Sequence, residues 1–137
     1  MKLLDTDICI EILRGNKSII ERRGATPDDT ATTWITACEL AYGAEKSARA
    51  RENQELVDRF LATLPIFGLD PAAARHFGRI KTRLEGKGKR LADADLFISA
   101  IALARGAQLV TGNRRHYERI EELEIEDWMH AGTGTSG

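Results

Sequence analysis

The chain has few of the features that mark secreted, disulfide-bonded or membrane-spanning proteins. It contains two cysteines, Cys9 and Cys38, which form neither a disulfide framework nor a zinc-binding spacing. We interpret both as small core residues of a reduced, cytoplasmic protein. The longest nearly apolar run covers residues 97–104 and is too short to span a bilayer, so we expect no membrane association. Acidic residues at positions 5 and 7 interrupt the N-terminal apolar stretch, so we expect no secretory leader.

An excess of charge of one sign is also missing. Lys and Arg total 20 and Asp and Glu total 21, which gives a formal net charge of −1. This balance excludes a generally polycationic nucleic-acid binder, so any such binding has to come from a local patch. Apolar residues make up 42% and charged residues 30% of the chain, which is typical of a globular protein. The length of 137 residues predicts one domain, to which we assign residues 1–130, followed by a flexible C-terminal tail over 131–137.

Strands and helices are predicted to alternate along the chain. Apolar and β-branched segments predict strands over 2–5, 30–34, 65–69, 108–111 and 123–126. Helical periodicity and capping signals predict helices over 6–14, 17–23, 36–48, 50–64, 71–86, 92–105 and 114–119. This alternation predicts an α/β fold whose central, mostly parallel sheet is flanked by helices on both faces. In such sheets, ligands bind outside the carboxyl ends of the strands.

Four polar side chains stand where predicted strands end or the following helices begin: Asp5, Glu39, Asp95 and Asn113. If the three carboxylates share one edge of the sheet, they repel one another unless they are protonated or bridged by a cation. Mg²⁺ and Mn²⁺ take oxygen ligands and keep positions open for water and phosphate. The pattern therefore favours metal-assisted hydrolysis of phosphodiester bonds.

Each of these side chains also has an explanation as part of a helix start. The candidates are Asp5 or Thr6 as the cap of the first helix, Thr36 and Glu39 as a capping box, Asp93 as the cap of the helix over 92–105, and Asn113 as the cap of the last turn. Asp93 and Asp95 project roughly 200° apart on a helix, so the first can cap while the second points elsewhere. A carboxylate on the nearly apolar helix over 92–105 is costly unless something compensates it. For Asp7 and Asp93 we favour capping.

Four segments resemble, in order and spacing, the motifs of PIN-domain ribonucleases. They are LLDTDI at 3–8, ITACELAYGA at 35–44, DADLFISA at 93–100 and LVTGNRRHY at 109–117. The resemblance extends over about residues 1–128 and is strongest to VapC-type toxins of bacterial toxin–antitoxin pairs. It implies a PIN-like three-layer α/β sandwich and a Mg²⁺- or Mn²⁺-dependent endoribonuclease. It also implies an RNA substrate, a homodimer and a cognate antitoxin protein that holds the enzyme inactive.

The resemblance also assigns roles to the four polar side chains. Asp5 and Asp95 fall at metal-ligand positions, and Glu39 completes the acidic cluster either directly or through bound water. Asn113 falls where many family members carry Asp, which leaves open whether a second metal is held without substrate. We therefore take all four as candidate catalytic residues. No histidine has a metal or acid–base spacing, and we expect surface or partly packed positions for His76, His116 and His130.

A basic segment precedes the helix that carries Asp95. Residues 79–90 contain six Lys or Arg residues and one acid. Because the loop half of this segment leads directly into that helix, we expect it to meet RNA phosphates. The residues expected at phosphates are Lys87, Lys89, Arg90, Arg114 and Arg115. The alternative is a solvated helix face and linker. Residues 118–127 carry six acids and are expected to lie away from the nucleic acid.

Aromatic and apolar side chains accompany the helices predicted over 36–64. Trp34 and Tyr42 are able to stack on bases, but core or interface positions are commoner for such residues. We expect ordinary core packing for most members of the group Leu40, Tyr42, Leu56 and Phe60. Part of this surface is a candidate for an amphipathic antitoxin segment or for the second subunit.

Three other functions are weaker alternatives. Asp5-Thr-Asp7 after a strand resembles the start of a haloacid-dehalogenase-type aspartyl phosphotransferase, but Cys9 stands where that family expects Thr or Val. A receiver domain needs a phosphoacceptor aspartate that ends its third strand, whereas the segment over 65–69 leads to the helix cap Asp70. A degenerate PIN fold that only binds RNA or protein is the non-enzymatic alternative, and the intact acidic residues argue against it.

Overall fold

The computed structural model describes residues 1–130, and the predicted tail over 131–137 lies outside them. One sheet has the strand order β3-β2-β1-β4-β5, and every pairing in it is parallel. The strands are β1 (Lys2–Leu4), β2 (Thr30–Thr33), β3 (Ile66–Phe67), β4 (Gln108–Thr111) and β5 (Ile125–Asp127). The helices are α1 (Thr6–Leu13), α2 (Lys17–Ala25), α3 (Trp34–Glu45), α4 (Ala50–Leu61), α5 (Pro71–Gly86), α6 (Asp93–Arg105) and α7 (Arg114–Tyr117). The predicted parallel α/β fold is confirmed.

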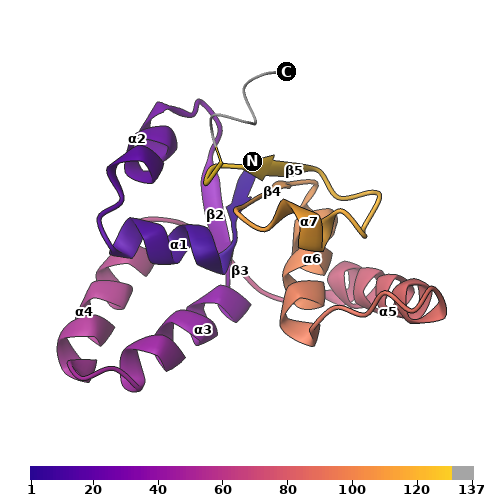
Figure 1. Ribbon diagram of the computed structural model, residues 1–137, viewed down its shortest axis with the longest axis horizontal. Helices are drawn as coiled ribbons and strands as arrows, with labels where there is room; N and C mark the ends of the chain where they lie inside the picture. The colour runs from indigo at the N-terminus through magenta and orange to yellow at the C-terminus, as the bar shows by residue number, and fades with distance from the viewer. Residues whose placement is uncertain (131–137) are drawn as a thin grey trace.

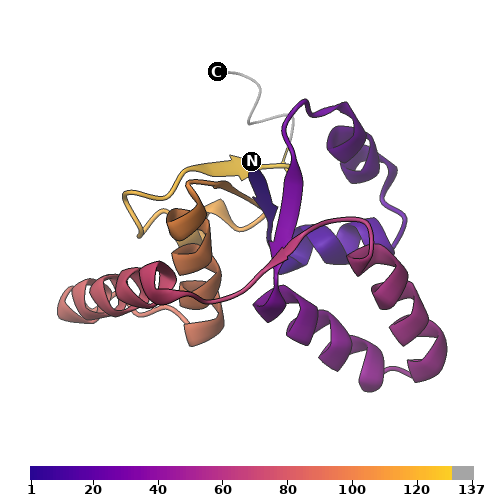
Figure 2. The same ribbon diagram turned by 180° about the vertical axis from the view of Figure 1, so that it is seen from behind.

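The helices form one layer on each face of the sheet. Helices α1 to α4 lie on one side, and α5 to α7 lie on the other (Figures 1 and 2). Leu3 and Leu109 pack in the core with α5 and α6, whereas Leu4 and Val110 pack in the core with α1 to α4. Neighbouring strand residues point to opposite faces, so consecutive apolar residues of β1 and β4 supply both cores. The three-layer sandwich is thus built on two cores that share one sheet.

The limits of two helices agree with the capping signals in the sequence. Helix α5 begins after Asp70, whose Oδ1 accepts a hydrogen bond from the Ala73 N–H at 2.8 Å. Pro71 occupies the first helical position, where its missing N–H leaves no bond unmade. Helix α6 ends at Gly106, which has the left-handed φ of 63° that glycine adopts without strain. Among the described residues, no helix is both long enough and apolar enough to cross a membrane.

The alternative explanation of Thr36 and Glu39 as a capping box of α3 is wrong. The helix begins earlier than expected, and its cap is Thr33, whose Oγ1 accepts a hydrogen bond from the Thr36 N–H at 3.1 Å. Thr36 therefore lies inside the helix and is not a cap. Because Glu39 is then a full turn into α3, its carboxylate is not used at the helix start and is available elsewhere.

Two further sequence predictions are wrong. Cys9 is buried as expected, but Cys38 is exposed on α3. Apolar neighbours in sequence did not decide its environment, because the turn of the helix directs this position away from the core. Asp93 is the first residue of α6 and not its cap, since Ala92 holds the cap position without a side-chain bond. The Asp93 carboxylate instead accepts a hydrogen bond from Lys81 Nζ at 2.9 Å.

Candidate active site

The site lies at the carboxyl ends of β1 and β4, which are parallel neighbours in the centre of the sheet. Asp5 directly follows β1, and Asn113 follows β4 by two residues. The Asp5 N–H donates to the Val110 carbonyl oxygen at 2.9 Å, so strand-like bonding continues up to the first acidic residue. The topology therefore brings the first and fourth motifs to one edge, as the sequence predicted.

Asp5 is a buried carboxylate, with 6% of its surface exposed. It caps α1, and its Oδ1 accepts a hydrogen bond from the Thr6 N–H at 2.8 Å. Its Oδ2 accepts from the Thr111 hydroxyl at 2.9 Å. Burial, followed by repulsion from Asp7, raises the pKa of Asp5 to about 7 despite these hydrogen bonds. Within residues 1–130, Asp5 takes part in none of the salt bridges formed by Lys or Arg, so a bound cation would compensate its charge.

Asp7 does not cap α1, which corrects the role we favoured for it. Its Oδ1 accepts from the Ile8 N–H, and its Oδ2 accepts from the Gly112 N–H, both at 2.8 Å. Burial raises the pKa of Asp7. A Cβ at Gly112 would lie 3.0 Å from Asp7 Oδ2 and 2.9 Å from the Met129 Cβ. Asp7 and Gly112 together tie the start of α1 tightly to the loop that carries Asn113.

Asp95 lies in the first turn of α6 and is contacted from α7. His116 Nε2 lies 2.8 Å from Oδ2, and the Tyr117 hydroxyl donates to Oδ1 at 3.1 Å. The same hydroxyl also interacts with Asp5 and lowers the pKa of that carboxyl. Burial and both carboxylates in turn raise the pKa of Tyr117. Asp5 and Asp95 therefore approach one phenol oxygen, although they are far apart in the sequence.

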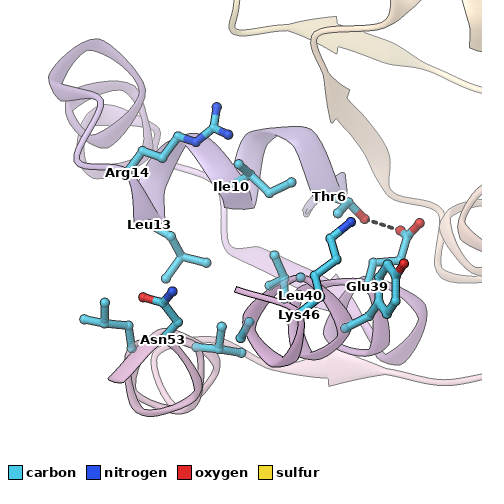
Figure 3. A pocket seen from close by; sticks show the side chains of 13 residues that line it. Thr6, Ile10, Leu13, Arg14, Glu39, Leu40, Lys46 and Asn53 are labelled. Carbon is cyan, nitrogen blue, oxygen red and sulfur yellow. Dashed lines mark hydrogen bonds between the residues drawn. The ribbon is translucent and has the colours of Figure 1, made fainter. Parts of the chain in front are cut away.

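Glu39 reaches this edge from α3. Its side chain is exposed, and Oε1 accepts a hydrogen bond from the Thr6 hydroxyl at 2.6 Å (Figure 3). Thr6 directly follows Asp5 and also lies 3.0 Å from Thr36, measured between the two Oγ1 atoms. Thr6 therefore connects Glu39 to the segment that holds Asp5.

Asn113 and the two arginines after it occupy the loop side of the site. Asn113 holds the cap position of α7 but makes no side-chain capping bond, and its N–H donates to Thr111 Oγ1 at 3.0 Å. Arg114 donates to the Ile125 carbonyl oxygen at 3.1 Å, so part of its guanidinium is directed toward β5. Arg115 is exposed. The alternative explanation of Asn113 as a helix cap therefore does not account for its side-chain amide, which makes no capping hydrogen bond.

The acidic side chains suit a hard cation but do not form a closed cage. Within residues 1–130, no three His, Cys, Asp or Glu side chains are grouped in a way that could hold a metal ion. Oxygens of Asp5, Glu39 and Asp95 accept hydrogen bonds from neighbouring side chains instead. Each carboxylate oxygen has a second lone pair, and an all-oxygen donor set is the kind that Mg²⁺ and Mn²⁺ prefer. Asp5 is a buried carboxylate without a salt bridge to any described residue, and a bound divalent cation would supply the missing positive charge.

The sequence missed His116 and Tyr117 as residues of this site. His116 was expected at the surface or partly packed, and it is indeed partly exposed, but it touches a candidate catalytic acid. Nothing in its spacing from other histidines indicates this role. The available signal was its place directly after Asn113 in the fourth motif, at the same edge of the sheet as Asp95.

Acidic residues partly neutralise the basic segment over 79–90. Arg83 donates two hydrogen bonds to Glu122, at 3.1 and 2.7 Å, and Lys87 Nζ lies 4.0 Å from Glu121. We expected the acids of residues 118–127 away from bound RNA, yet two of them lie against the segment proposed to bind it. Within residues 1–130, Lys89 and Arg90 are among the basic side chains of this segment that form no ion pair.

A groove of about 640 Å³ opens beside Glu39 between α1, α3 and α4 (Figure 3). Its walls are largely apolar and include Ile10, Leu13, Leu40, Leu56 and Val57, with Arg14 and Lys46 among the charged lining residues. Leu40 and Phe60 are buried as predicted, but Tyr42 and Leu56 are 65% and 45% exposed. Core packing was expected for most of these four residues, and it holds for Leu40 and Phe60 but not for Tyr42 and Leu56. Trp34 is also exposed.

Comparisons with known proteins agree with this architecture. The family model described as PIN domain matches residues 2–123. Ribonuclease VapC2 of Haemophilus influenzae is 36% identical over 93% of this chain and 97% of its own length. The tRNA(fMet)-specific endonuclease VapC of Shigella flexneri is 35% identical over 92% of this chain and 96% of its own. A crystal structure of DNA-bound VapBC from Salmonella typhimurium superposes with a TM-score of 0.88 at 37% identity, covering 93% of this chain and 97% of that one.

Proposed function

The chain belongs to the PIN domain family, and we propose that it is a divalent-metal-dependent endoribonuclease, the toxin of a toxin–antitoxin pair. The observation that carries the proposal is the approach of Asp5 and Asp95 to one hydroxyl at the carboxyl ends of parallel strands. Relatives of nearly the same length are named ribonucleases or tRNA-specific endonucleases. The function covers residues 1–130 as a single nuclease domain.

Asp5 and Asp95 are the ligands we assign to the cation, and Glu39 completes the acidic cluster. When bound, a divalent cation polarises a phosphate oxygen and lowers the pKa of a coordinated water. We assign Mg²⁺ or Mn²⁺ because every donor in the cluster is an oxygen. An oxygen-only site disfavours softer metals, which prefer thiolate or imidazole.

The chain's own residues contribute positioning and charge. Thr6 and Thr111 hold the two oxygens of Asp5, so this carboxylate is oriented before substrate arrives. One carboxylate oxygen of Glu39 accepts the hydrogen bond from Thr6. The other carboxylate oxygen of Glu39 is available to orient an attacking water. The Asn113 amide, which makes no capping bond, is placed to orient a ligand or water.

RNA phosphates would meet the site from its basic side. Lys87, Lys89 and Arg90 lie in the loop before α6, and Arg114 and Arg115 lie on α7. Exposed cationic side chains that lack acidic partners bind a phosphate most favourably, because no existing ion pair is broken on binding. We therefore rank Lys89, Arg90 and Arg115 above Lys87, which lies near Glu121.

The groove beside Glu39 is the surface we assign to the antitoxin. Its apolar walls between three helices suit the apolar face of an amphipathic segment. A crystal structure of VapBC2 from Rickettsia felis bound to a DNA fragment from their promoter superposes on this chain with a TM-score of 0.87 at 32% identity. An antitoxin in this groove would adjoin Glu39 and block the acidic edge. A homodimer and a cytoplasmic location are parts of the same proposal and rest on family membership.

Cleavage of RNA by purified protein tests the proposed function. With Mg²⁺ or Mn²⁺, the wild-type protein is expected to cleave RNA, and Asp5→Asn or Asp95→Asn to lower the rate by at least roughly 100-fold. Asp58→Asn, which changes an exposed carboxylate on α4, is the matched control and should leave the rate unchanged. Excess EDTA should stop cleavage by the wild type. Equal cleavage by the wild type and both site variants would refute the assignment.

A further inference from the structure

Two neighbouring side chains on α7 contact the same carboxylate. His116 Nε2 lies 2.8 Å from one oxygen of Asp95, and the Tyr117 hydroxyl donates to the other at 3.1 Å. We propose that His116 and Tyr117 are positioning residues, which hold the Asp95 carboxylate beside Asp5 in the orientation that a divalent cation requires. This inference rests on the proposed metal-dependent function.

The arrangement restrains the carboxylate more than burial alone does. The side chains of Asp95 and His116 are 27% and 31% exposed, so solvent could otherwise compete for these oxygens and the carboxylate could rotate. One donor on each oxygen opposes that rotation, because turning the group breaks both bonds. Each oxygen keeps a second lone pair, so these bonds do not prevent coordination of a cation.

The donors are themselves held in place. Tyr117 is fully buried in the core on the α5 and α6 side of the sheet. The His116 ring packs edge-on against it, with ring centroids 5.7 Å apart and an interplanar angle of 87°. Because a carboxylate only accepts hydrogen bonds, His116 must carry a proton on Nε2. Within residues 1–130, the hydrogen bonds from α7 to the Asp95 carboxylate come from His116 and Tyr117.

Four variants separate positioning from general packing. His116→Leu removes the ring N–H, whereas His116→Gln keeps an N–H donor at a similar distance from the backbone. Tyr117→Phe removes only the hydroxyl and leaves the buried ring. His76→Gln changes a partly buried histidine on α5 and is the matched control. Thermal unfolding of each variant shows whether the fold is retained.

Binding of Mn²⁺ alone, followed by electron paramagnetic resonance of the free ion, is the first measurement. His116→Leu and Tyr117→Phe are each expected to weaken Mn²⁺ binding by roughly 10-fold, the usual effect of removing a partner that orients a metal ligand. His116→Gln should recover most of the affinity, and His76→Gln should bind as the wild type does. Affinities equal to the wild type in both His116→Leu and Tyr117→Phe would overturn the proposal, as would a wild type that binds no Mn²⁺.

Imidazole ¹⁵N spectroscopy of the metal-free protein is the second measurement and does not depend on activity. His116 is expected to show a proton on Nε2, and Asp95→Asn should shift its signals while those of His76 stay unchanged. Unshifted His116 signals in Asp95→Asn would overturn the proposal. A wild type that shows the expected Mn²⁺ and ¹⁵N results but cleaves no RNA would refute the proposed nuclease and leave the positioning role intact.

Discussion

The acidic edge of the sheet and the basic segment of α5 with its following loop differ in how each charge is held. Asp5 is buried, and its carboxylate accepts hydrogen bonds from the Thr6 N–H at the start of α1 and from the Thr111 hydroxyl of the neighbouring strand. Arg83 of the basic segment is held through its ion pair with Glu122, and both side chains are about a third exposed. Parallel topology therefore places charges at strand ends, whereas the net charge of a surface depends on which loop packs beside it.

The largest expected effect concerns the buried charge of Asp5. Its pKa lies at about 7 in the folded protein against 3.8 ordinarily, so the folded state holds the proton more tightly than the unfolded chain does. Stability of the metal-free wild type should therefore fall as pH rises from 3.8 to about 7, with the loss complete above that. Asp5→Asn escapes this loss and still caps α1, so it should be more stable at pH 8 by a few kcal/mol.

Urea unfolding in EDTA measures this difference. The gain in unfolding free energy of Asp5→Asn over the wild type should be larger at about pH 8 than at about pH 5, because the wild-type carboxyl is ionised at the higher pH. An advantage of the same size at both pH values would contradict the role given to burial.

A smaller effect on stability is expected when one glycine at the acidic edge and one glycine in α5 are each replaced by alanine. Gly112→Ala places a methyl group against Asp7 and the Met129 Cβ, so we expect a loss of about 1–3 kcal/mol of stability. Gly78→Ala in α5 meets no heavy atom within 4 Å and should instead gain about 0.5–1 kcal/mol from higher helix propensity. Thermal unfolding of both variants checks the opposite signs, and destabilisation by both would show that α5 is as tightly packed as the acidic edge.

The basic segment is tested by charge removal. The triple change of Lys87, Lys89 and Arg90 to Gln should weaken RNA binding by about tenfold and flatten its salt dependence, because fewer counterions are released on binding. Binding is measured at several salt concentrations in an Asp5→Asn background, which leaves the RNA probe intact. Lys17→Gln, an exposed change on α2, is the control. Unchanged binding by the triple variant would remove this segment from the proposed interface.

The smallest effect concerns the ion pair of the basic segment. The hydrogen bonds from Arg83 lower the pKa of Glu122 to about 2, so this pair stabilises the fold above pH 4.5 and its contribution is lost as pH falls toward 2. Because both side chains are partly exposed, Glu122→Gln should cost less than about 1 kcal/mol near neutral pH. The difference between wild type and variant should vanish in acid unfolding at about pH 2. A difference that persists there would mean that Glu122 acts through packing and not through charge.

The sequence predicted the sheet and the position of Asp5 at its edge because both depend on short-range signals. Strands and helices follow local apolar patterns, and a residue that ends a parallel strand must lie at the carboxyl edge. Caps were less predictable. Thr36 with Glu39 matched a capping box, but Thr33 three residues earlier formed the cap. Likewise, Cys38 has apolar neighbours in sequence yet is exposed, because the direction of a helical side chain depends on how the helix packs.

The alternating α/β fold, the PIN family membership and the acidic residues of the motifs can all be recognised in the amino-acid sequence. These properties are encoded in local patterns and in the order of four short motifs. The three-dimensional packing sets which side chains contact these acids: Thr111 at Asp5, Thr6 at Glu39, and His116 with Tyr117 at Asp95. It also decided that acidic residues lie against the basic segment. Such contacts join residues far apart in the chain, so they depend on strand register and on the packing of whole helices.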